Sequence, residues 1–107
     1  MFCTIMSKLF VVLVQTVPGY AEYVKAHPEH QQHQLAWFQK IAKEGMLVAC
    51  GPFVPHDGTG LWILRAESIE EVQELAKTSP RYTDGMLDLA HTRITEWGAS
   101  IGKERFA

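Results

Sequence analysis

The stretch Met46–Glu67, MLVACGPFVPHDGTGLWILRAE, contains two apolar segments separated by a loop rich in glycine and proline. The first segment, Met46–Phe53, ends in a Gly-Pro pair, and the second, Leu61–Glu67, follows an Asp-Gly turn signal. Short apolar runs of this kind, bounded by turn residues, predict β-strands. Two consecutive strands with no helix between them therefore form the middle of the domain.

A helix is predicted on each side of this pair of strands. Pro28 suits the first position of a helix and Gly45 suits the position after its end, so the preceding helix runs to about Glu44. Ser68, with a glutamate three residues later, matches the capping box, which predicts a second helix over about Ile69–Lys77.

Two further strands complete the pattern. Lys8–Thr16, KLFVVLVQT, is a continuous apolar run of the kind that is buried on both faces, and Met86–Trp97 predicts the last strand. A short helical turn is expected at Tyr20–Ala26, and a linker or turn at RYTDG, residues 81–85. The order β-α-β-β-α-β predicts an α+β, ferredoxin-like domain with a four-stranded antiparallel sheet and two helices on one face. Because its other face would be bare, two sheets are expected to pair as a homodimer.

The 107 residues fit one domain, with residues 1–6 and 98–107 expected as tails. The net charge of −2, without a cluster of lysine and arginine, argues against a nucleic-acid partner. Leu9–Val14 is too short to span a membrane and no cleavage pattern follows it, so a cytoplasmic protein is expected. Cys3 and Cys50 lack the spacing of a zinc site or a disulfide framework, and Cys50 is expected to be a small buried hydrophobe.

The segment His27–Phe38, HPEHQQHQLAWF, carries three histidines in seven positions before it turns apolar. At about 100° per residue, Gln34 falls near the middle of an apolar arc, His30 lies inside the arc, and His33 lies at its edge. Polar groups on an inner helix face must find partners or cost stability, so their presence asks for a reason. The arc is formed by Leu35, Trp37, Phe38, Ile41 and Ala42.

Three interpretations of these histidines are open. In an acid–base site, His30 would tend to be neutral because the helix N-terminus disfavours its charged form, and a neutral imidazole suits a general base. Alternatively, the histidines are solvated or hydrogen-bonded to the neighbouring loop. In a metal site, His30 and His33 would need a third ligand. The conceivable donors are His56, Asp57 and His91.

The last predicted strand carries a second polar pair. Strand alternation places Leu89, His91, Arg93, Thr95 and Trp97 on one face. A face with both His91 and Arg93 could line a cavity for an anionic or phenolic ligand, or it could be an edge exposed to water.

Three segments together resemble the YCII-related (YciI-like) proteins over roughly Lys8–Trp97: LAWFQKIAKEGMLVACGPF, then GTGLWILRAESIEEVQELAKTSP, then GMLDLAHTRITEW. The shared pattern is a helix ending in glycine, a strand ending in Gly-Pro, a third strand running into a helix that begins Ser-x-Glu-Glu, and a final strand ending in an aromatic residue. The order and spacing of these pieces carry the match. The resemblance implies a dimeric α+β barrel built of ferredoxin-like subunits.

The resemblance also implies a site, made of a histidine at the start of the first helix and an aspartate just before the proline after the second. In this sequence those positions hold Gln34 and Ser79, so the His–Asp dyad is not intact. His30 is the first candidate to replace the histidine, and His33 is the second. The candidates for the carboxylate are Asp57 and Asp84.

Characterised relatives include a dehydrochlorinase of chlorinated hydroxyquinones, and the wider superfamily includes muconolactone isomerases. The resemblance therefore implies an enzyme of proton transfer, leading to isomerisation or elimination, that acts on a small cyclic or aromatic-derived molecule. His30 is expected to be its acid–base group, Gln34 a hydrogen-bond partner of a substrate oxygen, and the pocket walls Trp37, Phe53 and Trp62. No redox cofactor is expected, because the chain has no Gly-rich dinucleotide or phosphate loop. No metal is expected either, because no sequence rule places a third ligand near His30 and His33. The alternatives are a non-catalytic small-molecule-binding or accessory protein and a domain that binds a larger partner.

Overall fold

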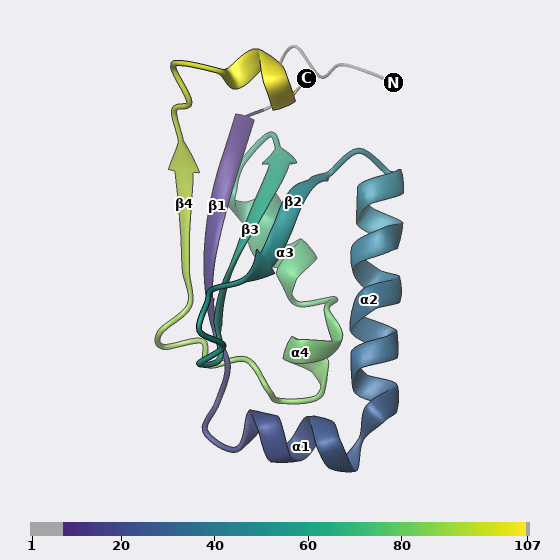
Figure 1. The fold of residues 1–107 in the computed structure, drawn as a ribbon. Coiled ribbons are helices and arrows are strands. Elements are labelled where there is room, and N and C mark those ends of the chain that lie inside the picture. Colours follow the sequence, from purple (N-terminus) through teal and green to yellow (C-terminus); the bar gives the residue numbers. More distant parts are fainter. Residues whose placement is uncertain (1–7, 107) are drawn as a thin grey trace.

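The computed structural model describes residues 8–106, whose helices and strands are shown in Figure 1. The expected tail at residues 1–6 lies outside the described residues. In chain order, the elements are β1 (Lys8–Gln15), α1 (Tyr20–Ala26), α2 (Pro28–Lys43), β2 (Leu47–Pro52), β3 (Thr59–Ala66), α3 (Ile69–Ala76), α4 (Pro80–Thr83), β4 (Arg93–Trp97) and the 3₁₀ helix η2 (Lys103–Phe106).

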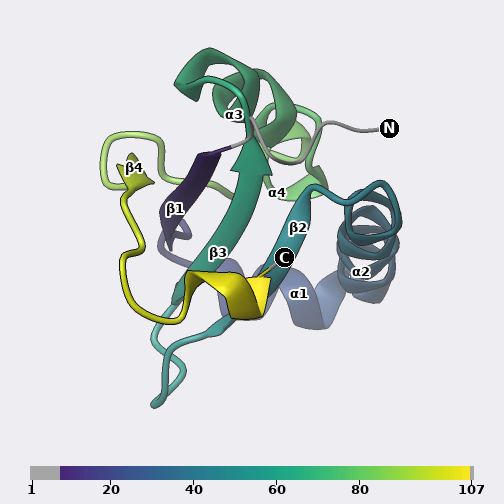
Figure 2. The ribbon, with the colours of Figure 1, turned by 90° about the horizontal axis from the view of Figure 1, so that it is seen from above.

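The sheet has the strand order β2-β3-β1-β4, and neighbouring strands are antiparallel throughout. The longest pairing joins the two central strands, with Val12 of β1 opposite Trp62 of β3. Figure 2 shows α3 and α2 on one side of the sheet, while the C-terminal segment turns toward the other side. This order and layering confirm the predicted ferredoxin-like α+β fold. Pairing of two copies stays a prediction.

The core lies between the sheet and the helices, and alternating residues of the central strands build it. On β1, Phe10, Val12 and Val14 are at most 3% exposed, whereas Leu13 is 41% exposed. The prediction that this strand is buried on both faces is therefore wrong for the single chain, because the helices cover only one face. The other core residues are Trp37, Ile41, Trp62, Leu64, Ala66, Val72, Ala76 and Leu87.

The last strand is shorter than predicted, spanning Arg93–Trp97 rather than Met86–Trp97. Residues 86–92 form an isolated bridge to the segment after β1 and then a hydrogen-bonded turn. Consequently His91 lies in the turn, and strand alternation does not place it on a common face with Arg93. The expected C-terminal tail likewise contains the short 3₁₀ helix η2.

Two local predictions are also corrected. The segment that follows α3, predicted as a linker or turn, forms the short helix α4, because Pro80 occupies its first position and the Ser79 hydroxyl accepts a hydrogen bond from the Tyr82 amide. Cys50, predicted to be buried, is exposed, because β2 is an edge strand of the sheet. Within residues 8–106, no helix is long and apolar enough to cross a membrane.

Candidate functional site

Helix α2 turns two polar side chains away from water. Its buried residues, His30, Gln34, Trp37 and Ile41, recur at the spacing of one helix face. His30 is 1% exposed and Gln34 is 2% exposed, so the prediction that both lie on the inner face is confirmed. The buried strip is narrower than the predicted arc, because Leu35 is 57% exposed. His33 and Ala42 are exposed as well.

Both ring nitrogens of His30 have partners. Nδ1 lies 2.7 Å from Oδ2 of Asp84, and Nε2 lies 3.2 Å from the hydroxyl of Tyr20. An ionised carboxylate can only accept a hydrogen bond, so Nδ1 carries the proton that it donates to Asp84. The lone pair of Nε2 in the neutral ring then accepts the hydroxyl proton of Tyr20. The imidazole is thus held in one tautomer, with its basic nitrogen directed at a phenol.

Arg81 extends this arrangement by one more hydrogen bond. Its Nε donates to the hydroxyl oxygen of Tyr20 at 3.1 Å. The guanidinium carbon lies 5.6 Å from the centre of the Tyr20 ring and 5.9 Å from the centre of the Phe38 ring. The order Arg81–Tyr20–His30–Asp84 therefore forms a continuous chain of hydrogen bonds that links α4, α1 and α2.

Gln34 and Ser79, where the resemblance implies a His–Asp dyad, both contact the start of α4. Oε1 of Gln34 accepts a hydrogen bond from the backbone amide of Arg81 at 3.0 Å. Ser79 is fully buried and caps the same helix. Helix starts leave amide groups without intrahelical partners, so Gln34 and Ser79 supply acceptors that α4 needs. Nε2 of Gln34 has no hydrogen-bond partner among the described residues.

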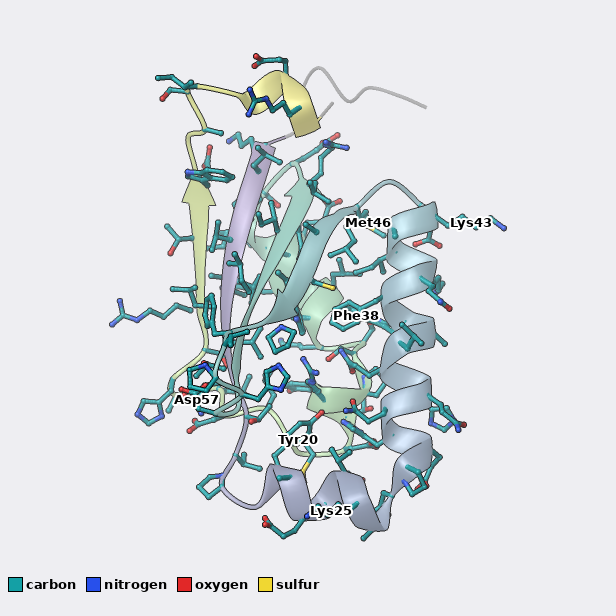
Figure 3. All side chains as sticks on the ribbon, viewed as in Figure 1. Tyr20, Lys25, Phe38, Lys43, Met46 and Asp57 are labelled. Carbon is teal, nitrogen blue, oxygen red and sulfur yellow. The ribbon has the colours of Figure 1, made fainter. Side chains whose placement is uncertain are left out.

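An open cleft of about 1080 Å³ lies beside the hydrogen bonds of Tyr20 and Arg81, between α1, α2, α4 and one end of the sheet. Figure 3 shows Tyr20 rising from α1 and Phe38 reaching in from α2 toward the space between that helix and the sheet. Both residues line the cleft, together with Cys50, Trp62 and Arg81. The cleft therefore combines aromatic walls with a phenol, a thiol and a guanidinium group.

The predicted site residues are distributed unevenly around this cleft. Trp62 and His91 line it. His30 and Gln34 are buried behind its wall, and Trp37 is in the core, where its Nε1 donates to the Thr78 hydroxyl at 2.9 Å. The remaining predicted residues lie on the surface outside the cleft lining: His33 on α2, Phe53 after β2 and Arg93 on β4.

The structure does not support the metal interpretation of the histidines in the residues that it describes. No group of three His, Cys, Asp or Glu residues there gathers closely enough to hold an ion. Asp57, one of the conceivable ligands, accepts hydrogen bonds from the amide and the hydroxyl of Thr59. These two bonds hold the pKa of the Asp57 carboxyl below its usual value.

Cys50 and Tyr23, which lie near the hydrogen bonds that join Arg81 to Asp84, also have shifted pKa values. Partial desolvation raises the pKa of the Cys50 thiol, although the residue is exposed, and the positive charge of Arg81 opposes that shift. Desolvation raises the pKa of the Tyr23 phenol, and the negative charge of Asp84 adds to this effect. Tyr23 also packs edge-on against His30, with 5.4 Å between the ring centres. The environment thus keeps the Tyr23 phenol protonated.

Two members of this hydrogen-bonded series, Tyr20 and Arg81, were not predicted from the sequence as site residues. Tyr20 follows a Pro-Gly break, and Arg81 belongs to the segment predicted as a linker. Tyr20 and Arg81 are 61 residues apart, so no periodicity joins them. The sequence offered one signal for them: the short segments 20–26 and 81–85, next to the two predicted helices, are rich in polar and aromatic residues.

A family model described as the YCII-related domain matches residues 8–98. Among curated proteins, no relative matches the chain.

Three solved structures share the fold. The 5-chloro-2-hydroxyhydroquinone dehydrochlorinase of Burkholderia phenoliruptrix, in complex with 2,5-dihydroxybenzoquinone, is 19% identical with a TM-score of 0.69, covering 86% of this chain and 95% of its own. A Bacteroides thetaiotaomicron protein assigned as an antibiotic biosynthesis monooxygenase is 8% identical with a TM-score of 0.60, covering 92% and 94%. The protein PA3566 of Pseudomonas aeruginosa is 11% identical with a TM-score of 0.57, covering 89% and 95%. At these identities the likeness concerns the fold.

Proposed function

Because this chain belongs to the YCII-related family, we propose that it is an enzyme that catalyses proton transfer, without a cofactor, on a small cyclic or aromatic-derived molecule. The reaction is an isomerisation or an elimination such as dehydrohalogenation. One observation carries the proposal: the imidazole of His30 is buried behind the wall of the cleft, and the Asp84 carboxylate holds it at 2.7 Å.

The His30–Asp84 pair has the properties that acid–base chemistry requires. The carboxylate orients the ring and stabilises the imidazolium that forms when the ring gains a proton. In an elimination, removal of a C–H proton leaves its electron pair to form a double bond while the leaving group departs with its own pair. In an isomerisation, the same proton returns to a different carbon. Neither reaction requires a change in oxidation state of the protein.

The cleft suits a ligand of this class. Aromatic and apolar walls with a few convergent polar groups are typical of small-molecule sites. Here Tyr20 and Phe38 supply aromatic surface, while Arg81 supplies a positive charge for an oxygen that becomes negative during the reaction. The dehydrochlorinase that shares the fold binds a ligand of this kind, 2,5-dihydroxybenzoquinone.

The second candidate is a non-catalytic small-molecule-binding or accessory protein. It is favoured by the structural duties of Gln34 and Ser79, which occupy the positions of the family dyad and stabilise the start of α4. A chain that had lost catalysis could retain these residues for folding alone. The distinction lies in whether a bound molecule exchanges a proton in a reaction that depends on His30.

We also propose that two copies pair through the outer face of the sheet, as the family resemblance implies. Leu13 is 41% exposed at the centre of that face, and Val11 and Ile63 are only half-buried. Multi-angle light scattering coupled to size-exclusion chromatography measures the mass directly. Leu13→Glu is expected to convert a dimer into monomers, and a monomeric wild-type protein would contradict the pairing. The expected cytoplasmic location stays a prediction.

The experiment that tests catalysis follows proton exchange in D₂O by ¹H NMR. The two probes are 2,5-dihydroxybenzoquinone and α-angelica lactone, whose ring double bond migrates by loss and regain of one proton. The wild-type chain is expected to accelerate exchange or migration, and His30→Gln to lose about 10²- to 10⁴-fold of that rate. Glu29→Gln, on the exposed side of the same helical turn, is the matched control. Probe binding without exchange would favour the binding protein.

A further inference from the structure

We infer that the hydroxyl of Tyr20 is the catalytic group that exchanges a proton with the ligand, and that His30 acts through it as a positioning residue. This inference rests on the proposed function and names the reacting group of the same site. It follows from where each side chain lies relative to the cleft: Tyr20 lines the cleft, whereas His30, which is 1% exposed, and Asp84 do not.

The burial of His30 excludes direct contact with a bound molecule. Its side chain is 1% exposed, and both of its ring nitrogens are occupied, one by Asp84 and one by Tyr20. The edges of the ring are covered by Tyr20 and Tyr23, which pack against it with ring centres 5.6 and 5.4 Å away. A ligand in the cleft therefore meets the phenol of Tyr20 before it can meet the imidazole.

The hydrogen bonds of Tyr20 give its hydroxyl a way to lose its proton. The proton already lies in a 3.2 Å hydrogen bond to Nε2 of His30, and Nε of Arg81 donates to the oxygen from another side at 3.1 Å. When the proton moves to Nε2, the phenolate stands beside a guanidinium and the imidazolium stands beside a carboxylate. Each charge that forms is then next to an opposite charge, which lowers the cost of forming it.

The proton step balances without a co-reactant. The O–H bond of Tyr20 breaks as an N–H bond forms on His30, and the phenolate oxygen takes a proton from a C–H bond of the ligand. The electron pair of that C–H bond stays on the ligand as an enolate, or forms a double bond as the leaving group departs with its own pair. In an elimination, Tyr20 then releases the ligand proton to water in the cleft and recovers its own proton from His30. In an isomerisation, Tyr20 returns its proton to another carbon of the ligand and recovers the first proton from His30.

Arg81 has capacity left for the ligand. A guanidinium carries five N–H donors, and the structure assigns one of them, at Nε, to the Tyr20 hydroxyl. Within residues 8–106, its terminal nitrogens make no hydrogen bond. Since Arg81 lines the cleft, these nitrogens can receive the oxygen on which the enolate charge develops.

The test compares Tyr20→Phe with Tyr23→Phe in the proton-exchange assay with α-angelica lactone. Both substitutions remove one phenol oxygen and keep a ring that packs edge-on against His30. Tyr20→Phe is expected to lower kcat by about 10²- to 10⁴-fold with little change in KM. It also leaves the buried Nε2 of His30 without a partner, so its thermal midpoint is expected to fall, and kcat is measured below that midpoint. Tyr23→Phe is expected to keep wild-type kcat.

The outcomes separate this inference from the proposed function. Wild-type kcat in Tyr20→Phe, together with loss of activity in His30→Gln, would overturn the role of Tyr20 and leave the proposed function standing. Absence of exchange by the wild-type chain would overturn both. ¹⁵N NMR of the histidine rings in the unmodified protein gives a second readout, because an Nε2–H tautomer of neutral His30 would leave no acceptor for the Tyr20 proton and would overturn the inference.

Discussion

The imidazole of His30 and the carboxylate of Asp84 are 54 residues apart in the chain, yet their side chains approach to 2.7 Å. His30 stands one helical turn before Gln34, and Asp84 follows α4, five positions after Ser79. Gln34 and Ser79 hold the start of α4, and α4 carries the chain to Asp84. The pair therefore lies next to Gln34 and Ser79, the positions at which the family resemblance implies a His–Asp dyad.

Removal of Asp84 is predicted to affect stability and activity differently in two variants. Asp84→Ala leaves the buried Nδ1–H of His30 without an acceptor, which is expected to cost about 1–3 kcal/mol of the free energy of unfolding in urea. Asp84→Asn keeps an acceptor oxygen and is expected to cost less. Both variants lose the negative charge, so both are expected to lower proton exchange by about 10²- to 10⁴-fold. Wild-type stability of Asp84→Ala would contradict this hydrogen bond.

The contact between β2 and β3 leads to a prediction for two neighbouring glycines. A Cβ atom at Gly60 would lie 2.9 Å from the carbonyl oxygen of Gly51 on the adjacent strand. Gly60→Ala is therefore expected to cost about 1–3 kcal/mol in urea unfolding, because backbone must move. Gly51→Ala is the matched control: no atom lies within 4 Å of its added Cβ, so its change is expected to stay within about 0.5 kcal/mol. Similar losses in both variants would contradict the packing described here.

The fold was predictable because its signals are local. The cap at Ser68 and the Pro28 and Gly45 boundaries concern a few consecutive residues each, and all three lie at the ends of helices in the structure. The helical projection also predicted that His30 and Gln34 face inward, because period alone decides which face of a helix is apolar. It failed at Leu35, since the width of a buried strip depends on which neighbour covers it.

The site was predictable only in part, because its hydrogen bonds join residues that are distant in the chain. Asp84 was one of two candidate carboxylates, and only the position of α4 selects it over Asp57. The short last strand had a similar cause: residues 86–92 are apolar enough to extend β4, but the bridge of Leu87 to Thr16 and a turn replace that pairing. Such choices are made by tertiary contacts, which override local propensity.

Asp57 is predicted to make the stability of the protein depend on acidic pH. The hydrogen bonds from Thr59 lower the pKa of the folded-state carboxyl, so the ionised form is favoured by folding. Its contribution is fully present above the unfolded-state pKa of about 3.9 and is lost as the pH falls through the lower folded-state value. The difference in urea midpoint between wild type and Asp57→Asn is expected to be constant from about pH 7 to 5 and to shrink below about pH 4. Thr59→Val should reduce that difference, and a loss centred near pH 6 would contradict the assignment.

The thiol of Cys50 reports on the charge inside the cleft. Partial desolvation raises its pKa, so at pH 8 a smaller fraction is thiolate and its alkylation by iodoacetamide is expected to be slower than that of free cysteine. Arg81 opposes this shift across the cleft, so Arg81→Gln is expected to slow alkylation further. Lys43→Gln removes the same charge at the far end of α2, where Figure 3 shows Lys43 pointing outward, and is expected to leave the rate unchanged. The rates are measured by mass spectrometry in a Cys3→Ser background. Faster alkylation in Arg81→Gln would mean that the guanidinium shields the thiol from the reagent. It would contradict the prediction that the charge of Arg81 stabilises the thiolate.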